Sequence, residues 1–127
     1  MLGSVHVLAV DDSPDVLDLV VEILQRSGAR VTAAGSAEQA LVLLEQERPD
    51  VLVSDFEMPG RDGLWLIEQV RRLPSARGGA TPAACLTGLT GPEDRARILR
   101  AGFQYHVPKP VRSERLLGIV ALLALKP

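Results

Sequence analysis

Aromatic residues make up only 3% of this 127-residue sequence, so a folded core has to be built from Val, Leu, Ile and Ala. Hydrophobic residues reach 46%, which is enough for such a core and excludes a disordered chain. Positive charge is not in excess: the net charge is -2, which gives no support for direct binding to nucleic acid. The length fits one domain, and we expect residues 1–127 to form it.

The sequence has a single cysteine, Cys85, which excludes an internal disulfide and favours a reducing, cytoplasmic setting. Its longest apolar stretch, residues 116–125, is far shorter than the ~20 residues that span a bilayer. The first four residues show no basic segment leading into an apolar run, so no signal peptide is predicted. We therefore expect a cytoplasmic protein that does not insert into a membrane.

Short apolar runs alternate with helical patterns about five times along the chain. The runs, typical of strands buried on both faces, are residues 5–10, 31–34, 51–55, 83–86 and 103–107. Helices are predicted after them, at residues 14–28, from residue 36 onward, and at 63–73, 90–102 and 113–125. This alternation predicts an α/β fold, with one doubly wound, five-stranded parallel sheet in the flavodoxin-like order 2-1-3-4-5 and helices on both faces.

Three of the predicted helices have recognisable start signals. Ser13 suits the N-cap position and Pro14 the first helical position. Residues 36–39 form a capping box, and Thr90 with Glu93 can form a second one. These signals fix where the helices begin after the first, second and fourth strands.

Unusual polar residues fall where the predicted strands end. They are Asp11 and Asp12 after the first strand, Asp55 at the end of the third, Thr87 after the fourth and Lys109 after the fifth. Parallel strands end at one edge of a sheet, which is the edge where open α/β sheets bind ligands. Three carboxylates brought together repel one another and need a cation, and hard oxygen ligands favour Mg²⁺. A magnesium ion, a lysine and a hydroxyl group around a carboxylate are the parts that phosphoryl transfer requires.

Six short motifs occur in order and at compatible spacing: VDDS at 10–13, SDFEMPG at 54–60, DG at 62–63, LTG at 86–88, AG at 101–102 and VPKP at 107–110. Each motif alone is weak, but the whole series is highly specific. Over essentially its whole length, the sequence resembles the receiver domains of two-component response regulators. The loop at Gly78–Gly79, the segment at 101–104 and His106 are also similar to receivers fused to hybrid sensor kinases.

The resemblance implies that Asp55 takes a phosphoryl group from the phosphohistidine of a kinase or phosphotransfer domain. It implies that Asp12 and Asp55 ligate Mg²⁺ directly, that Asp11 acts mainly through water, and that the backbone carbonyl of Glu57 supplies another ligand. The implied protein is a phosphoacceptor signalling domain, with limited self-phosphorylation and autodephosphorylation, rather than an enzyme.

The resemblance also assigns roles to residues on the fourth and fifth strands. Thr87 would bond a phosphoryl oxygen and move toward it, while Lys109 would pair with the phosphoryl group and form a cis peptide with Pro110. The switch position, three residues before the lysine, is usually Tyr or Phe in the family, and here it is His106.

Two other classes of function were compared with this one. A Mg²⁺-dependent aspartyl-phosphate hydrolase of the haloacid dehalogenase type carries its nucleophile in an Asp-x-Asp motif after the first strand, whereas Asp55 follows the third. A flavodoxin-type flavin module needs a phosphate-cradling loop after the first strand, where the acidic pair would repel phosphate. The hydrolase remains the alternative hypothesis.

The last predicted helix is apolar around much of its circumference, at Leu116, Leu117, Ile119, Val120, Leu122, Leu123 and Leu125. A helix packed on one face of a sheet needs only one apolar stripe, so the excess indicates a covered outer surface. We predict that this helix, the fourth helix and the fifth strand form a homodimer or docking interface.

Overall fold

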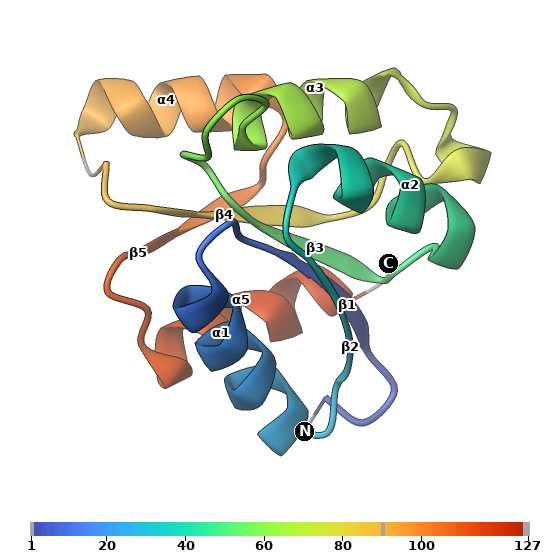
Figure 1. The fold of residues 1–127 in the computed structure, drawn as a ribbon, viewed down its shortest axis with the longest axis vertical. Helices are drawn as coiled ribbons and strands as arrows, with labels where there is room; N and C mark the ends of the chain where they lie inside the picture. The colour runs from blue at the N-terminus through green and yellow to red at the C-terminus, as the bar shows by residue number, and fades with distance from the viewer. Residues whose placement is uncertain (1, 90, 126–127) are drawn as a thin grey trace.

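Five parallel strands form one sheet in the order β2-β1-β3-β4-β5 in the computed structural model, which describes residues 2–89 and 91–125 (Figure 1). The strands are β1 His6–Val10, β2 Arg30–Ala34, β3 Val51–Asp55, β4 Ala83–Thr87 and β5 Tyr105–Pro108. The helices are α1 Pro14–Arg26, α2 Ala37–Glu47, α3 Gly63–Arg72, α4 Pro92–Ala101 and α5 Ser113–Ala124, with a short 3-10 helix η1 at Ser75–Arg77. The predicted fold class and strand order are confirmed.

The sheet separates two hydrophobic cores. Helices α1 and α5 cover one face, and α2, α3 and α4 cover the other (Figure 1). Successive residues of a strand point to opposite faces, so Val7 and Ala9 pack under α1 and α5, whereas Leu8 and Val10 pack on the other side. The strands β1, β3 and β4 are buried throughout, which is why they appear in the sequence as apolar runs rather than as alternating patterns.

Helix α1 starts as predicted, with Ser13 accepting a hydrogen bond from the Val16 amide (3.5 Å) and Pro14 in the first turn. At α2, Ser36 accepts from the amide of Gln39 (3.2 Å), but the Gln39 side chain accepts from the Gly35 amide (3.0 Å) rather than from that of Ser36. In the predicted capping box the Gln39 side chain would accept from the Ser36 amide, and in the structure it accepts from the residue before Ser36.

The starts of α4 and β5 each differ from the sequence prediction by two residues. Helix α4 begins at Pro92 with Gly91 as N-cap and no side-chain cap, and the Thr90 of the predicted capping box lies outside the described residues. Strand β5 begins at Tyr105 rather than at Phe103, because the Phe103 amide donates to the Ile98 carbonyl (3.4 Å) and so closes the end of α4. In the apolar run at 103–107, Phe103 thus ends α4 and the strand begins two residues later.

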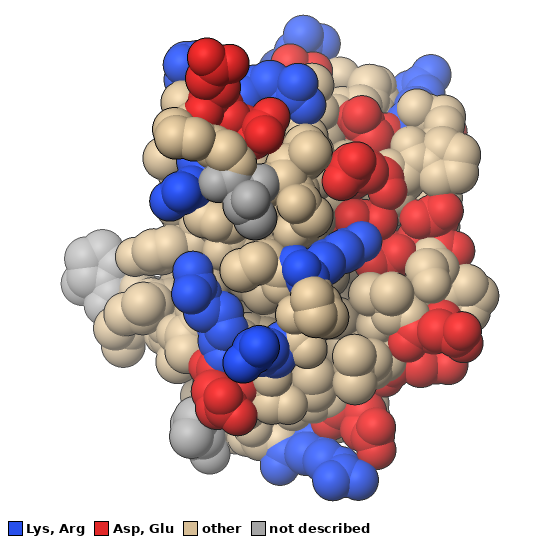
Figure 2. Space-filling view, turned by 90° about the vertical axis from the view of Figure 1, so that its left-hand side faces the viewer, with Lys and Arg blue, Asp and Glu red and all other residues tan. Residues whose placement is uncertain are grey.

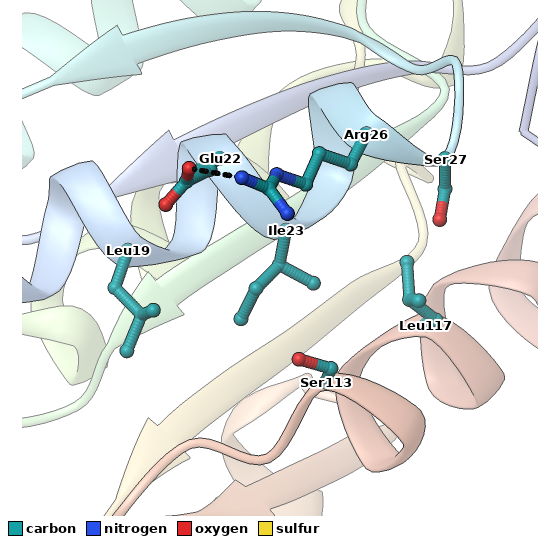
Figure 3. Close-up of a pocket in the computed structure, with 7 residues that line it drawn as sticks. All are labelled: Leu19, Glu22, Ile23, Arg26, Ser27, Ser113 and Leu117. Carbon is teal, nitrogen blue, oxygen red and sulfur yellow. Dashed lines mark hydrogen bonds and ion pairs between the residues drawn. The ribbon is translucent and has the colours of Figure 1, made fainter.

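Helices α1 and α5 lie side by side on one face, with a hollow of about 320 Å³ between them (Figure 3). Leu117 of α5 points toward α1 (Figure 3), and Leu117, Ala121 and Ala124 all pack against the core on that face. Some of the apolar side chains of α5 are therefore covered by α1 rather than by a partner protein. Leu122 and Leu125 remain exposed. No helix within residues 2–89 and 91–125 has the length and apolar character needed to cross a membrane.

The side chain of Arg71, which the sequence did not single out, ties three loops together. Its guanidinium donates to the carbonyls of Gly102 (2.8 and 3.0 Å), Gly79 (2.9 Å) and Thr81 (2.7 Å). Burial lowers the pKa of Arg71. These bonds use the planar, multi-donor geometry that distinguishes arginine from lysine, and they hold the ends of α3, α4 and η1 in place.

Gly63, the first residue of α3, lies against the end of β3. Its amide donates to the Phe56 carbonyl (3.0 Å), and a Cβ at this position would be 2.3 Å from the Asp55 carbonyl oxygen and 2.9 Å from the Phe56 Cα. Gly63→Ala is expected to lower the free energy of unfolding by about 1–3 kcal/mol, because backbone rather than a flexible side chain would have to move. Thermal melts measure the change.

Gly118 provides the matched control. It is exposed in the interior of α5, and an added Cβ would meet nothing within 4 Å. Gly118→Ala is expected to raise stability by up to about 1 kcal/mol through helix propensity. A Gly63→Ala protein that melts at or above wild type would show that α3 has room to move away from β3.

Candidate functional site

The carboxyl ends of the strands lie on the left in Figure 1, and Figure 2 faces this edge, where acidic side chains gather on the right. The structure brings Asp11, Asp12 and Asp55 together there, with carboxylate oxygens within 4.8 Å of one another. The Nζ of Lys109 lies 2.9 Å from Asp55 Oδ1 and 4.0 Å from Asp11 Oδ2. Four of the residues predicted from the strand ends therefore form one crevice.

Asp11 is the most constrained of the three carboxylates. Its Oδ1 accepts a hydrogen bond from the Ser13 amide (2.9 Å), whereas its buried Oδ2 has no hydrogen-bond partner among the described residues. Burial raises the pKa of Asp11 and the charges of Asp55 and Asp12 add to this, while the Ser13 amide and Lys109 oppose it. A buried carboxylate oxygen without a donor beside two other carboxylates is the arrangement that a bound cation would satisfy.

Lys109 supplies the positive charge in the crevice. Burial alone lowers its pKa, but the hydrogen bond and charge of Asp55, together with the charge of Asp11, outweigh that effect and leave the pKa raised. The backbone amide of Lys109 donates to the Thr87 carbonyl (2.9 Å), and the Lys109–Pro110 peptide is cis. Lys109, which directly follows β5, therefore contacts the ends of both β3 and β4.

Thr87 and Glu57 lie at the border of the crevice. Thr87 is fully buried, and its hydroxyl accepts a hydrogen bond from the Leu89 amide (2.9 Å). The amide of Glu57 approaches Asp55 Oδ1 at 3.4 Å, so the Glu57 backbone follows the carboxylate closely while its side chain is exposed.

His106 faces a different environment. It is half-buried, and burial lowers its pKa, with the charges of Arg95 and Arg115 adding to the effect. Its electrostatic neighbours are thus the arginines of α4 and α5. The structure places this residue beside those helices instead of with the three carboxylates.

Cys85 of β4 is not a candidate nucleophile. Its side chain is fully buried, and burial, followed by the charge of Asp55, raises the pKa of the thiol to about 12. It stays protonated and packs as a small core residue.

Sequence reasoning missed part of the local support of the site. Ser13 was assigned to capping alone, yet its amide also orients the Asp11 carboxylate. The spacing of an Asp two residues before a Ser is the signal for such a turn, because Asp side chains commonly accept from the amide two positions on.

The fold and the crevice define a class of protein: a parallel α/β domain with three acidic groups and a lysine at the ends of β1, β3 and β5. Residues 7–121 match the response regulator receiver domain. The chain belongs to the family of response regulator receiver domains and is a two-component signalling module.

Similar proteins include both short and long chains. An uncharacterized 14.6 kDa protein of Leptolyngbya boryana is 45% identical over 94% of this chain and 89% of its own length. The sensor histidine kinase GacS of Pseudomonas protegens is 35% identical over 92% of this chain, which spans only 13% of that kinase. The solved receiver domain of the sensor histidine kinase PA1611 from Pseudomonas aeruginosa, which has a magnesium ion in its active site cleft, is 27% identical with a TM-score of 0.85, covering 94% of this chain and 97% of its own.

Proposed function

We propose that this chain is a phosphorylation-dependent switch in which Asp55 accepts a phosphoryl group from the phosphohistidine of a histidine kinase or phosphotransfer domain. The observation that supports it most is the approach of Asp11, Asp12 and Asp55 within 4.8 Å, with Lys109 Nζ 2.9 Å from Asp55. A carboxylate oxygen of Asp55 attacks phosphorus, the bond from phosphorus to the histidine nitrogen breaks, and the imidazole leaves with the electron pair.

Mg²⁺ is the cation that this set of oxygens fits, and the magnesium in the PA1611 receiver supports the same assignment. Asp12, Asp55 and the Glu57 carbonyl would hold it, with Asp11 acting through water. The ion would supply charge neutralisation on the phosphoryl oxygens. Lys109 stays charged and would pair with the phosphoryl group, since its pKa is raised.

The switch would proceed through Thr87 and His106. In the structure the Thr87 hydroxyl accepts from the Leu89 amide, and we propose that it turns to bond a phosphoryl oxygen instead. Strand β4, which carries Thr87, pairs with β5, which carries His106. The His106 side chain would therefore change its position when Thr87 turns, in the field of the Arg95 and Arg115 charges. Phosphorylation would then change the surface made by α4, β5 and α5.

That surface is the proposed partner site. It exposes Leu99 of α4 (55%), Tyr105 of β5 (42%) and Leu122 of α5 (53%), which supports a homodimer or docking to a larger protein. Sedimentation with and without a phosphoryl mimic is expected to show association that increases with the mimic. A strict monomer in both states would argue against self-association and leave a different chain as the partner. Nucleic acid is not a proposed partner, because the net charge is -2.

Exposure to acetyl phosphate with and without Mg²⁺ tests the proposal. Intact mass is expected to show one phosphoryl group gained only with Mg²⁺, because the metal neutralises the crevice. Steady turnover of a phosphomonoester would instead support the aspartyl-phosphate hydrolase. A cytoplasmic location belongs to the same proposal, since the free thiol of Cys85 suits a reducing compartment.

A further inference from the structure

A second hollow, of about 420 Å³, lies beside the acidic crevice at the junction of β5 and α5. It is lined by Pro108, Lys109, Pro110, Arg112 and Arg115. No carboxylate is among these residues, and in the lower left of Figure 2 neighbouring basic side chains lie above a single acidic group. The hollow is therefore positive, whereas the neighbouring crevice is negative.

Within the described ranges 2–89 and 91–125, Lys109 is paired with Asp55 and Asp11, whereas the two arginines that line the hollow are not balanced by an acidic partner. Four other arginines lie near a glutamate, in the pairs Arg26–Glu22, Arg30–Glu47, Arg61–Glu38 and Arg77–Glu45. Arg112 and Arg115 form no ion pair in that part of the chain. Both arginine side chains are exposed and are thus available to an external anion.

Helix stability does not explain these two arginines. Arg112 is the N-cap of α5 without a side-chain cap, and Arg115 lies in the first turn. Cations at a helix N-terminus oppose the helix dipole, and like charges three residues apart repel one another. Glu114 in the same turn suits the dipole but forms no ion pair with either arginine within the described residues, so an external anion between the two arginine side chains would relieve their repulsion.

Lys109 connects the hollow to the phosphoacceptor, because it lines the hollow while its Nζ lies 2.9 Å from Asp55 Oδ1. We propose that the hollow is an anion subsite in which Arg112 and Arg115 select phosphodonors that carry a second negatively charged group beside the phosphoryl group. This inference rests on the proposed function of Asp55. Because the hollow shares Lys109 with the phosphoacceptor, the donor itself is favoured over an unrelated regulatory anion.

Two small acyl phosphates isolate this effect. Benzoyl phosphate has an uncharged acyl group, whereas 4-carboxybenzoyl phosphate adds a carboxylate that cannot reach the anhydride of its own molecule. In both reactions Asp55 attacks phosphorus, the bond from phosphorus to the acyl oxygen breaks, and the carboxylate product leaves with the electron pair. Intact mass distinguishes phosphorylation of the protein from its acylation.

The measurement is the ratio of phosphorylation rates with 4-carboxybenzoyl phosphate and benzoyl phosphate, with Mg²⁺ at low ionic strength. This ratio is expected to fall about two- to thirtyfold in Arg112→Gln/Arg115→Gln, since exposed arginine–carboxylate pairs contribute ~0.2–1 kcal/mol each. Arg26→Gln/Arg30→Gln, which removes equal charge far from the hollow, is expected to keep the wild-type ratio. Added salt is expected to weaken the wild-type preference.

An unchanged ratio in the Arg112→Gln/Arg115→Gln protein, with both donors still reacting, would overturn the subsite and leave the function of Asp55 intact. If neither donor reacted, the proposed function would fail, and NMR would then decide on the hollow. Inorganic pyrophosphate without metal is expected to shift the ring signals of His106, which is close to Arg115, but not those of His6 on β1. Equal or absent shifts at the two histidines would also overturn the subsite.

Discussion

Replacing Asp55 by Asn is expected to abolish Mg²⁺-dependent phosphorylation by acetyl phosphate, from a readily detected modified fraction to none. The amide that replaces the carboxylate has nearly the same shape but is neutral, so it lacks the nucleophilic oxygen and loses the charge that Lys109 pairs with. Intact mass spectrometry after a fixed exposure gives the modified fraction directly.

Asp15→Asn is the matched control for this experiment. Asp15 lies exposed in the first turn of α1, outside the group of three carboxylates, and its replacement removes the same charge. The control is expected to be phosphorylated to the wild-type extent. Wild-type modification in the Asp55→Asn protein would mean that another residue accepts the phosphoryl group.

Saturating Mg²⁺ is expected to raise the melting temperature by several degrees over that in chelator. Burial raises the pKa of Asp11 with help from its acidic neighbours, so the charged, metal-free site destabilises the fold at neutral pH. An ion that binds only the folded state adds ~2.7 kcal/mol at a hundred times its dissociation constant. Each 1 kcal/mol shifts the melting midpoint by roughly 3–6 °C in a domain of this size.

Asp12→Asn is expected to distinguish the effect of carboxylate repulsion on stability from the effect of metal binding. Asp12 is exposed, and its replacement removes one negative charge beside Asp11 and Asp55 without creating a cavity. The variant is expected to melt as high as wild type or higher in chelator, yet to gain little from Mg²⁺. Four melts, of two proteins in two buffers, give the comparison. An equal magnesium shift in both proteins would show that Asp12 is no ligand and that it serves the start of α1 instead.

The sheet and the acidic crevice could be predicted because both depend on regularities that are local in sequence. Buried strands such as β3 leave continuous apolar runs, and parallel strands must end at the same edge. Asp11, Asp55 and Lys109 could therefore be placed together without any knowledge of how helices pack.

Features that depend on how distant loops pack could not be predicted. Arg71 looks like an exposed helix residue in the sequence, because its carbonyl acceptors come from loops after α3 and α4. The prediction that Phe103 belongs to a strand was wrong for a related reason. The Phe103 amide donates to the Ile98 carbonyl at the end of α4, and apolar periodicity gives no information on that hydrogen bond. That Arg112 forms no ion pair within residues 2–89 and 91–125 likewise depends on where the glutamates lie in space.

Lys109 bonds to the sheet through its backbone amide and to the acidic crevice through its side-chain ammonium. Its amide bonds β5 to the Thr87 carbonyl, while its ammonium, at the end of a flexible chain, contacts Asp55. The ammonium can therefore exchange a carboxylate partner for a phosphoryl partner while the backbone bond between β4 and β5 stays in place. Charge can be redistributed at this edge without separating the strands, so the resting and signalling states can share one scaffold.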